Sequence, residues 1–534
     1  MSREWSEQQR KIFEWFESGS GNLLVRARAG TGKTTTIIEA TKRAPESAQL
    51  VAAFNKKIAQ ELERKIRDSG GCAESKTLHG VGYAVILRYW ERAQLDPRRG
   101  YDLAKRAAGD QAPDEMIKKA QKLAGIAKGC LAPMMRDMPR LDGFDNEERV
   151  TEHLGARGEL LDALEGLAIQ FDLEPDPEWQ KDGWTTVKLC GIVAQAMELA
   201  RHRPDGDVAP TLDYDDMIYL PVANGWARPR YDLVVIDEAQ DMNATQLALA
   251  MAVVTPTGRV AVVGDDRQAI YGFRGADSGA LDRLKLELGA TELGLTTTYR
   301  CGRAIVALAK KLVPDFEAGP DNPPGEVVEI DAKEMLDLAR AGDFILSRKN
   351  APLAAYCLKL IRAGKAARIE GKDVAAGLKA IVRRWKPRNL QALVDNIERW
   401  RDREIEKLTP KAGRPEADER ISVIRDQAEI LLALCDGLAN PMELMTRLDT
   451  MFGDSEEDRR PMIVCSSIHR SKGLEAERVF ILQNTLYPQT KVFIARDKMN
   501  PVEAASRAHA ITEEANLEYV AYTRAKNTLF MVDE

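Results

Sequence analysis

The sequence has no long hydrophobic run, and this absence excludes several classes of protein. None of its apolar stretches approaches the roughly 20 residues that a membrane-spanning helix needs. The first five residues, MSREW, lack the apolar core of a secretory signal. The 7 cysteines are scattered without a CxxC pair, which indicates reduced thiols in a cytoplasm rather than a disulfide scaffold, a zinc site or an iron–sulfur cluster. We therefore expect a cytoplasmic protein without membrane association.

An excess of positive charge is also missing, because 83 acidic residues outnumber 77 basic ones and give a formal net charge of −6. This balance does not exclude a nucleic-acid-binding protein, since binding needs only a local basic groove. What is present is the composition of a globular chain, with 44% hydrophobic and 30% charged residues. At 534 residues the chain is too long for one core, and we expect about two to four domains.

The stretch 23–40 carries the most specific signal in the chain. Leu23, Leu24 and Val25 predict a buried strand, the sequence ARAGTGKT follows at 27–34, and a helix is expected to continue from there. Glycines let such a loop turn its backbone N–H groups toward an anion, and the helix N-terminus adds a partial positive charge. A glycine-rich turn with a chance Lys-Thr pair is the alternative, but the preceding strand favours nucleotide binding.

Each position of this loop has an expected role toward ATP. Lys33 would reach the β- and γ-phosphates, and the Thr34 hydroxyl would ligate Mg²⁺. The residues expected to line the phosphate site are Ala29, Gly30, Thr31, Gly32, Lys33, Thr34 and Thr35.

Two later apolar runs end in the polar side chains that a phosphate loop requires. The run YDLVVI at 231–236 ends in Asp237, which would hold Mg²⁺ with Thr34, and in Glu238, which would orient and deprotonate the attacking water. After the run at 260–263, the amide of Gln268 is expected to sense the γ-phosphate. Two acids at a strand end are common by themselves, but strands that alternate with helices predict a parallel sheet that brings them to the loop.

Two other short segments offer groups that can recognise bases. The amide of Gln9 can pair with the N6 and N7 positions of adenine, although it also fits a helix capped by Ser6. Tyr271, Phe273 and Arg274 place two aromatic rings and a guanidinium in a glycine-flanked loop, which suits stacking with unpaired bases.

Taken in order, these segments resemble the motifs of superfamily 1A DNA helicases, the UvrD/Rep family. The segment LTTTYR at 295–300 is similar to the family pattern L-x-x-N-Y-R, with Thr298 where asparagine is usual. The segment SIHRSKGLE at 467–475 is similar to T-x-H-x-x-K-G-L-E. The segment EEANLEYVAYTRA at 513–525 is similar to E-E-x-R-L-x-Y-V-x-x-T-R-A, with Asn516 in place of an arginine. The motifs run from Gln9 to Arg524 and cover nearly the whole chain.

The resemblance implies further residues at the nucleotide. Arg300 and Arg524 would be arginine fingers that reach the γ-phosphate, because a permanently charged fork can follow charge onto the phosphoryl oxygens. Glu475 would contact the nucleotide sugar, and Tyr299 would stack on the adenine that Gln9 reads.

The resemblance also implies a path for single-stranded DNA. The residues in the segments that line this path are Phe54, Asn55, Thr77, His79, Tyr271, Phe273, Arg274, His469 and Lys472. A lone His79 is more often structural than functional, and for His469 and Lys472 a structural role beside the nucleotide is an equal alternative.

The architecture that the resemblance implies is α/β, with two RecA-like parallel-sheet motor domains and two mainly helical accessory insertions. Residues 1–84 and 213–279 would form domain 1A, with 85–212 inserted as 1B. Residues 280–350 and 461–534 would form domain 2A, with 351–460 inserted as a small 2B-like domain.

The implied activity is that of an ATP-dependent DNA helicase or translocase with ATP and Mg²⁺ as cofactors. It would move 3′-to-5′ on single-stranded DNA, act at junctions with duplex, and couple hydrolysis in the cleft between 1A and 2A to strand movement and unwinding. The first alternative is a translocase that displaces proteins and unwinds only with a partner, which the short 2B-like insertion and the chain end after Arg524 favour. The second is a nucleotide-gated scaffold subunit, against which the intact motor residues argue.

Overall fold

The computed structural model of the chain divides into two compact units. It describes residues 4–18, 20–53, 55–135, 158–171, 173–175, 179–180, 183–203, 209–270, 280–383, 385, 387–409, 415–452, 461–486 and 501–533. Unit 1 comprises Met1–Ala27, Lys33–Asp266 and Tyr271–Leu295, and unit 2 comprises Arg28–Gly32, Arg267–Ile270 and Thr296–Glu534. Among the described helices, none combines the length and the apolar character needed to cross a membrane.

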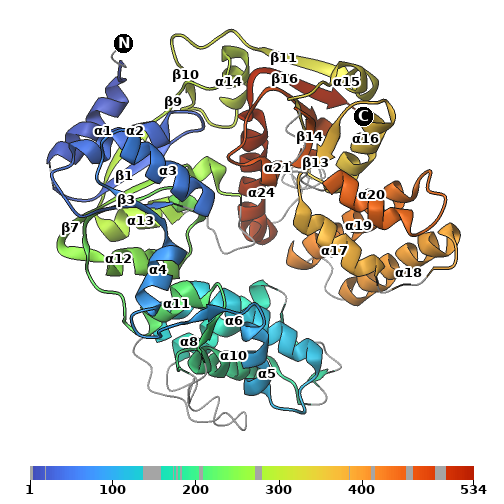
Figure 1. Ribbon diagram of the computed structural model, residues 1–534, viewed down its shortest axis with the longest axis horizontal. Coiled ribbons are helices and arrows are strands. Elements are labelled where there is room, and N and C mark those ends of the chain that lie inside the picture. Colours follow the sequence, from blue (N-terminus) through green and yellow to red (C-terminus); the bar gives the residue numbers. More distant parts are fainter. Residues whose placement is uncertain are drawn as a thin grey trace. The chain divides into compact units, whose positions relative to one another are not determined.

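Unit 1 is built on a six-stranded parallel sheet of order β3-β2-β6-β7-β1-β8 (Figure 1). Its strands are β1 (Leu23–Ala27), β2 (Gln49–Ala53), β3 (Glu74–Thr77), β6 (Tyr231–Ile236), β7 (Val254–Gly264) and β8 (Thr291–Leu295). The central strands are apolar at successive positions because both faces of the sheet are covered, as is usual for parallel sheets.

Each face of this sheet packs against its own set of helices. On one face Leu23, Val51 and Val235 share a core with Phe13 and Leu62. The helices here are α1 (Glu7–Ser18), α2 (Lys33–Arg43) and α3 (Lys56–Asp68). On the other face the core includes side chains of α4 (Leu78–Ile86), α11 (Asp216–Ala223), α12 (Ala244–Ala252) and α13 (Ala280–Leu288). The alternation of side chains along each strand therefore produces a doubly wound α/β layer structure.

A mainly helical insertion separates α4 from α11. Its elements are β4 (Gln94–Leu95), α5 (Arg99–Ala108), α6 (Asp114–Met135), α8 (Gly158–Gln170), α10 (Thr186–Ala200) and β5 (Thr211–Leu212). The two short strands, near the beginning and at the end of the insertion, pair in parallel.

Unit 2 contains a second six-stranded parallel sheet, of order β11-β16-β15-β12-β14-β13. Its strands are β11 (Glu326–Asp331), β12 (Phe344–Ser347), β13 (Ala367–Ile369), β14 (Ile463–Ser467), β15 (Ala476–Leu482) and β16 (Ala525–Asp533). A separate ladder pairs β9 (Thr297–Thr298) with β10 (Glu317–Ala318). The helices of this layer are α14 (Arg303–Ala309), α15 (Ala332–Leu338), α16 (Asn350–Arg362), α21 (Ile468–Ser471), α22 (Gln483–Leu486) and α24 (Pro501–Tyr522).

The insertion of unit 2 is helical and shares the core of its sheet. It consists of α17 (Lys372–Val382), α18 (Leu390–Leu408), α19 (Pro415–Cys435) and α20 (Glu443–Phe452). Leu393, Leu431 and Leu444 of this insertion belong to the same buried cluster as Ile345 and Phe480 of the sheet.

The predicted fold class, two parallel α/β sheets with two helical insertions, is confirmed, but two boundaries differ. The first sheet extends to Leu295, beyond the expected domain end at 279, because β8 pairs with β1. The second insertion begins after Ile369 rather than at 351, because β13 pairs with β14 in the main sheet. An apolar run predicts a strand, but it does not show which sheet the strand will join, since pairing depends on partners far away in sequence.

Candidate functional site

The phosphate loop connects β1 to α2 through two glycines whose backbone conformation favours that residue. Gly30 has φ 70° and Gly32 has φ 81°, in the left-handed region that side chains disfavour. A Cβ atom at Gly30 would also lie 2.5 Å from the Cβ of Arg300, which belongs to the same unit. The loop therefore requires glycine for its backbone angle and, at Gly30, for space.

Three contacts within unit 2 hold the loop residues 28–32. The Tyr299 amide donates to the Gly30 carbonyl at 2.9 Å. The Ala29 amide donates to the Tyr519 hydroxyl at 3.0 Å. Arg28 pairs with Asp315 at 2.9 Å between Nη2 and Oδ2. Arg28, Tyr519 and Asp315 were not among the predicted site residues, and they fix the path of the main chain through the loop.

Lys33, the first residue of α2, lies among carboxylates of unit 1. Its Nζ is 2.8 Å from Oε1 of Glu238. Burial alone would lower the pKa of Lys33, but the negative charges of Glu238, Asp237 and Asp265 outweigh burial and raise it. The ammonium group is therefore charged at neutral pH, and three carboxylates around one cation leave the cluster negative.

Asp237 and Glu238 follow β6, at the carboxyl end of the sheet where they were predicted. Burial and then the charge of Glu238 raise the pKa of Asp237 to about 6. The Glu238 amide donates to Oδ1 of Asp237 at 3.0 Å, and Glu238 itself has a left-handed φ of 54°. The two predicted carboxylates and Lys33 thus form one cluster.

This cluster can accept Mg²⁺ only together with a ligand that supplies more oxygens. In the parts of the chain that the structure describes, no group of three or more His, Cys, Asp and Glu side chains could hold a metal ion. Mg²⁺ is usually held by one or two protein oxygens together with substrate phosphates and waters. The carboxylate of Asp237 and the hydroxyl of Thr34 fit that requirement for a metal that arrives with a nucleotide.

A buried glutamine that the sequence interpretation did not single out connects Glu238 to the end of β7. Gln240 lies in the 3₁₀ turn η1 (Ala239–Asp241) and is 1% exposed. Its Nε2 donates to Oε2 of Glu238 at 2.6 Å, and its Oε1 accepts from the Asp265 amide at 3.0 Å. In the sequence, Gln240 could have been recognised as an amide two residues after Glu238, the predicted base, in the run DEAQD.

In unit 2 the structure brings Arg300 and Glu475 together. Nε of Arg300 lies 2.6 Å from Oε2 of Glu475, and Lys526 pairs with the other oxygen at 2.9 Å. Burial would raise the pKa of Glu475, but Lys526 and Arg300 lower it. Two residues that the family resemblance placed at the nucleotide are therefore direct neighbours.

The second predicted arginine finger, Arg524, is engaged inside unit 2. It is 1% exposed, and its guanidinium donates to the carbonyls of Val520 and Leu474 and to the Thr523 hydroxyl. Burial, and then the charge of Arg300, lower the pKa of Arg524 to about 10. A contact between Arg524 and a γ-phosphate remains a prediction.

Of the two residues predicted to bind adenine, one is buried and the other is half-exposed. Gln9 is 3% exposed, and its Oε1 accepts from the Ser6 amide at 3.1 Å while its Nε2 donates to the Thr36 hydroxyl at 2.9 Å. The Gln9 amide also donates to the Ser6 hydroxyl, so the helix-capping interpretation describes this structure. Tyr299 is half-exposed. Recognition of adenine by these two residues stays a prediction.

The segment around Gln268 is held by two side chains of unit 2. Lys472 donates to the Gln268 carbonyl at 2.7 Å, and Asn516 donates to the Ala269 carbonyl at 3.1 Å. For Lys472 this contact is the structural alternative to a role in DNA binding. Asn516, which stands where the family pattern has arginine, is buried.

The other residues predicted to contact DNA lie at helix starts or outside the described residues. Asn55 caps α3 and Thr77 caps α4. Burial lowers the pKa of His79. Burial, and then three neighbouring cations, lower the pKa of His469 to about 3, so this imidazole is neutral. The residues outside the described ranges are Phe54, Tyr271, Phe273 and Arg274. The DNA path is therefore still a prediction.

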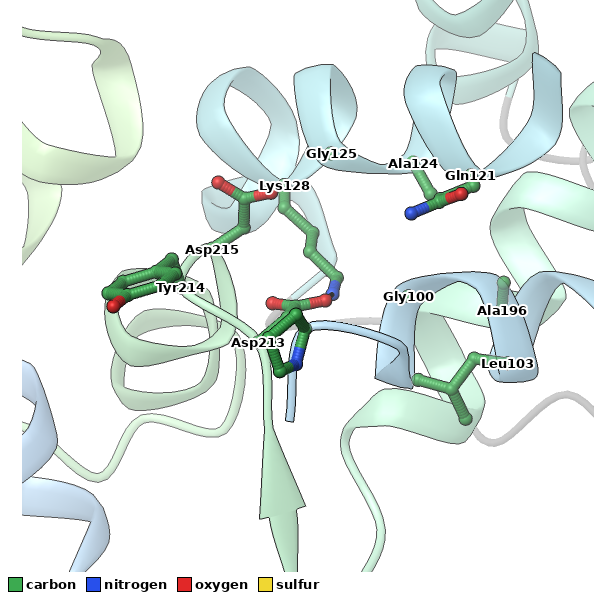
Figure 2. A pocket seen from close by; sticks show the side chains of 11 residues that line it. Gly100, Leu103, Gln121, Ala124, Gly125, Lys128, Ala196, Asp213, Tyr214 and Asp215 are labelled. Atoms are coloured by element: carbon green, nitrogen blue, oxygen red, sulfur yellow. Dashed lines mark hydrogen bonds and ion pairs between the residues drawn. The ribbon is translucent and has the colours of Figure 1, made fainter. Parts of the chain in front are cut away.

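A cavity of about 220 Å³ lies in the helical insertion of unit 1, beside a buried ionic network (Figure 2). Lys128 of α6 pairs with Asp213 and with Asp216, each at 2.7 Å. Arg99 of α5 also pairs with Asp216 at 2.7 Å. These ion pairs join α5 and α6 to the segment that leads into α11, so they hold the insertion to the sheet.

Comparison with known proteins places the chain in one family over its whole length. Residues 5–288 match the UvrD/REP helicase N-terminal domain, and residues 234–533 match the UvrD-like helicase C-terminal domain. Among solved structures, an arterivirus nonstructural protein 10 (helicase) in complex with DNA has a TM-score of 0.33 and 11% identity, covering 98% of this chain and 63% of that one.

Three relatives illustrate the range of similarity. F-box DNA helicase protein 1 of Schizosaccharomyces pombe is 24% identical over 99% of this chain and 57% of its own length. ATP-dependent DNA helicase UvrD2 of Mycobacterium tuberculosis is 25% identical over 95% of this chain and 75% of its own length. DNA helicase II of Escherichia coli is 24% identical over 55% of this chain and 38% of its own length. The chain thus spans a little over half of the first of these proteins, and by its two matching domains it belongs to the UvrD/Rep helicase family.

Proposed function

We propose that the chain is an ATP-dependent DNA motor that moves along single-stranded DNA and unwinds duplex. The observation that carries this proposal is the cluster of Lys33, Asp237 and Glu238, assembled from two strand ends in a chain that two UvrD-like domains span. The relatives named above are called DNA helicases, which supports DNA as the nucleic acid.

Hydrolysis would begin with an exchange of partners at Lys33. Its ammonium neutralises Glu238 at 2.8 Å, and a bound phosphate would compete for the same ammonium because it carries more charge. Glu238 would then be released to take a proton from the attacking water. Asp237 and Thr34 would hold Mg²⁺, which neutralises charge on the phosphates when it is bound.

Arg300 would contribute positive charge to the same reaction. Its guanidinium is balanced by Glu475, which also pairs with Lys526, so Arg300 can leave this carboxylate without stranding an unpaired charge. An arginine that moves onto the γ-phosphate stabilises the charge that develops there. Such a movement, driven by ATP and reversed by hydrolysis, would couple turnover to the DNA.

Movement in the 3′-to-5′ direction and action at junctions between single strand and duplex belong to this proposal, on family precedent. A translocase that unwinds only with a partner is the second candidate. It is retained because the insertion of unit 2, α17 to α20 within the residues that the structure describes, was predicted to be shorter than in large family members. A scaffold subunit with an idle ATPase conflicts with the intact lysine–carboxylate cluster.

One experiment tests the proposal. ATP hydrolysis by the purified chain is measured without nucleic acid and with single-stranded DNA, duplex DNA or single-stranded RNA, and unwinding is measured on duplexes with a 3′ or a 5′ tail. Stimulation by single-stranded DNA with unwinding of the 3′-tailed duplex is expected. Stimulation without unwinding would select the translocase, and no hydrolysis under any condition would overturn the proposal.

A further inference from the structure

We propose that Gln240 is a positioning residue that aims the Glu238 carboxylate and links it to the end of β7. The inference rests on the proposed function, because it assigns Gln240 a role in the hydrolysis that Glu238 would perform. Gln240 joins Glu238 on one side and the Asp265 main chain on the other, at 2.6 Å and 3.0 Å. It would act through Glu238, without touching the substrate.

Only an amide side chain satisfies both neighbours. The Asp265 backbone N–H can only donate, so it must face the amide oxygen, and the ionised Glu238 carboxylate can only accept, so it must face the NH₂ group. The orientation of the amide is thereby fixed by its partners. A glutamate here would keep the bond to Asp265 but would place a second negative charge against Glu238.

The surroundings of Gln240 leave it little freedom. The side chain is 1% exposed, and Asp265 is completely buried. A Cβ atom at Gly264 would lie 2.7 Å from Oε1 of Gln240 and 3.1 Å from Leu281, so the glycine provides space for the amide. A partly buried, charge-assisted hydrogen bond such as that between Gln240 and Glu238 is strong and directional.

The two carboxylate oxygens of Glu238 have different partners, Lys33 at Oε1 and Gln240 at Oε2. Lys33 binds Oε1, and it would pair with a phosphate group instead when ATP binds. Once Lys33 changes partner, the Gln240 amide on Oε2 would keep the carboxylate pointed toward the water. Asp265 precedes Gln268, the predicted γ-phosphate sensor, by three positions, so the link would also join the base to the sensor segment.

The test compares Gln240→Glu and Gln240→Met with Gln246→Glu as the control. Gln246 accepts from the Asn243 amide in the capping box of α12, and a glutamate can do the same, so the control makes the same chemical change away from Glu238. Both Gln240 variants should lower kcat of DNA-stimulated ATP hydrolysis by roughly 10- to 100-fold, with a change in KM of less than about threefold. Gln246→Glu should match the wild type.

The pH profile separates positioning from a purely structural role. In Gln240→Glu the added negative charge should move the acid limb of kcat to higher pH by about one unit, whereas Gln240→Met, which adds no charge, should lower the plateau without that shift. Binding of a fluorescent ATP analogue and thermal unfolding are measured on the same samples. If one variant does not fold, the other still decides the question through its plateau.

The outcomes distinguish this inference from the proposed function. A wild type that hydrolyses ATP while both Gln240 variants keep its kcat and pH profile would overturn the role of Gln240 and leave the proposed function intact. A wild type without hydrolysis under any condition would overturn the proposed function itself. The inference is supported if both Gln240 variants have a reduced kcat and only Gln240→Glu shifts the acid limb.

Discussion

The two sheets are alike in strand number and parallel pairing, but they place their predicted nucleotide residues at opposite ends of their strands. In unit 1, Lys33 and Asp237 come after β1 and β6. In unit 2, Glu475 and Arg524 come directly before β15 and β16. The rule that ligands bind at the carboxyl ends of parallel strands therefore locates the site of unit 1 and would miss the residues of unit 2.

The charge of the two groups also differs in sign. Unit 1 gathers three carboxylates around Lys33, a set that attracts Mg²⁺. Unit 2 surrounds the single carboxylate of Glu475 with Arg300 and Lys526, a set that attracts phosphate. If both groups serve one reaction, unit 1 supplies the base and the metal ligands, and unit 2 supplies the cations. The effects of removing one group or the other should then be distinguishable by experiment.

The largest effect is expected from Lys33→Ala. It removes the cation that faces three carboxylates, so ATP turnover should fall more than about 10³-fold, below detection. The measurement is steady-state hydrolysis with saturating single-stranded DNA. Lys42→Ala, in the same helix, removes a pair with Glu39 near the surface and should retain wild-type turnover. Appreciable turnover in Lys33→Ala would end the assignment of unit 1 as the catalytic half.

Arg300→Ala tests the contribution of unit 2. We expect kcat to fall about 10²- to 10³-fold, because a cation that would stabilise developing negative charge is lost, while binding of an ATP analogue weakens much less. Lys310→Ala is the control, since Lys310 makes an exposed pair with Glu317 at 3.7 Å. Equal losses in kcat and in analogue affinity would show that Arg300 binds ATP without favouring the transition state.

A third experiment contrasts how the two insertions are attached. Both insertions share a buried apolar cluster with their sheet, through Leu123 and Leu189 in unit 1 and through Leu393 and Leu431 in unit 2. The unit 1 insertion adds the buried ion pairs of Lys128 with Asp213 and Asp216. Lys128→Met would leave Asp213 and Asp216 short of a cation and should lower the free energy of unfolding by about 3 kcal/mol, measured by urea denaturation. Lys118→Met, which removes only a surface pair on the same helix, should change it by less than about 0.5 kcal/mol.

The smallest effect is a pH dependence that should belong to unit 1 alone. Since the pKa of Asp237 is raised to about 6, this carboxyl becomes protonated below that pH and loses its ability to ligate Mg²⁺. The kcat/KM for Mg·ATP should therefore fall by roughly tenfold between pH 7 and pH 5.

Stability should follow the opposite trend. A carboxyl whose pKa is raised on folding stabilises the protein fully below its unfolded value of 3.8, and this contribution is lost as pH rises through about 6. Asp237→Asn should therefore remove this component from thermal unfolding curves recorded between pH 4 and pH 7. A wild-type kcat/KM that is flat over this range would contradict the assigned carboxylate.

Much of unit 1 could be predicted from sequence because its signals are local. An apolar run predicts the strand, and the residues that follow it at once, Asp237 and Glu238 or the loop before Lys33, predict the functional groups at the strand end. The contacts that were not predicted are long-range: Arg28 with Asp315, Ala29 with Tyr519, and Lys128 with Asp213. No spacing pattern specifies such pairs, since they arise only when distant elements pack.

The burial of Arg524 was not predictable for the same reason. The motif around it predicted a finger that reaches the γ-phosphate, whereas its guanidinium donates to the carbonyls of Val520, in the preceding helix α24, and of Leu474. For Gln240 the position near Glu238 was visible in the sequence, but its second partner, the Asp265 amide, follows the end of β7 and is distant in sequence.

Glu238 has a left-handed backbone conformation, which lowers the stability of the fold at a residue predicted to take part in hydrolysis. A side chain at φ 54° costs about 1–2 kcal/mol relative to glycine, and glutamate gains nothing from this conformation as asparagine or glycine would. Selection for a robust fold alone would therefore favour glycine at this position. If Glu238 acts as the base, a substitution that relieves this backbone strain should stabilise the fold and lower activity.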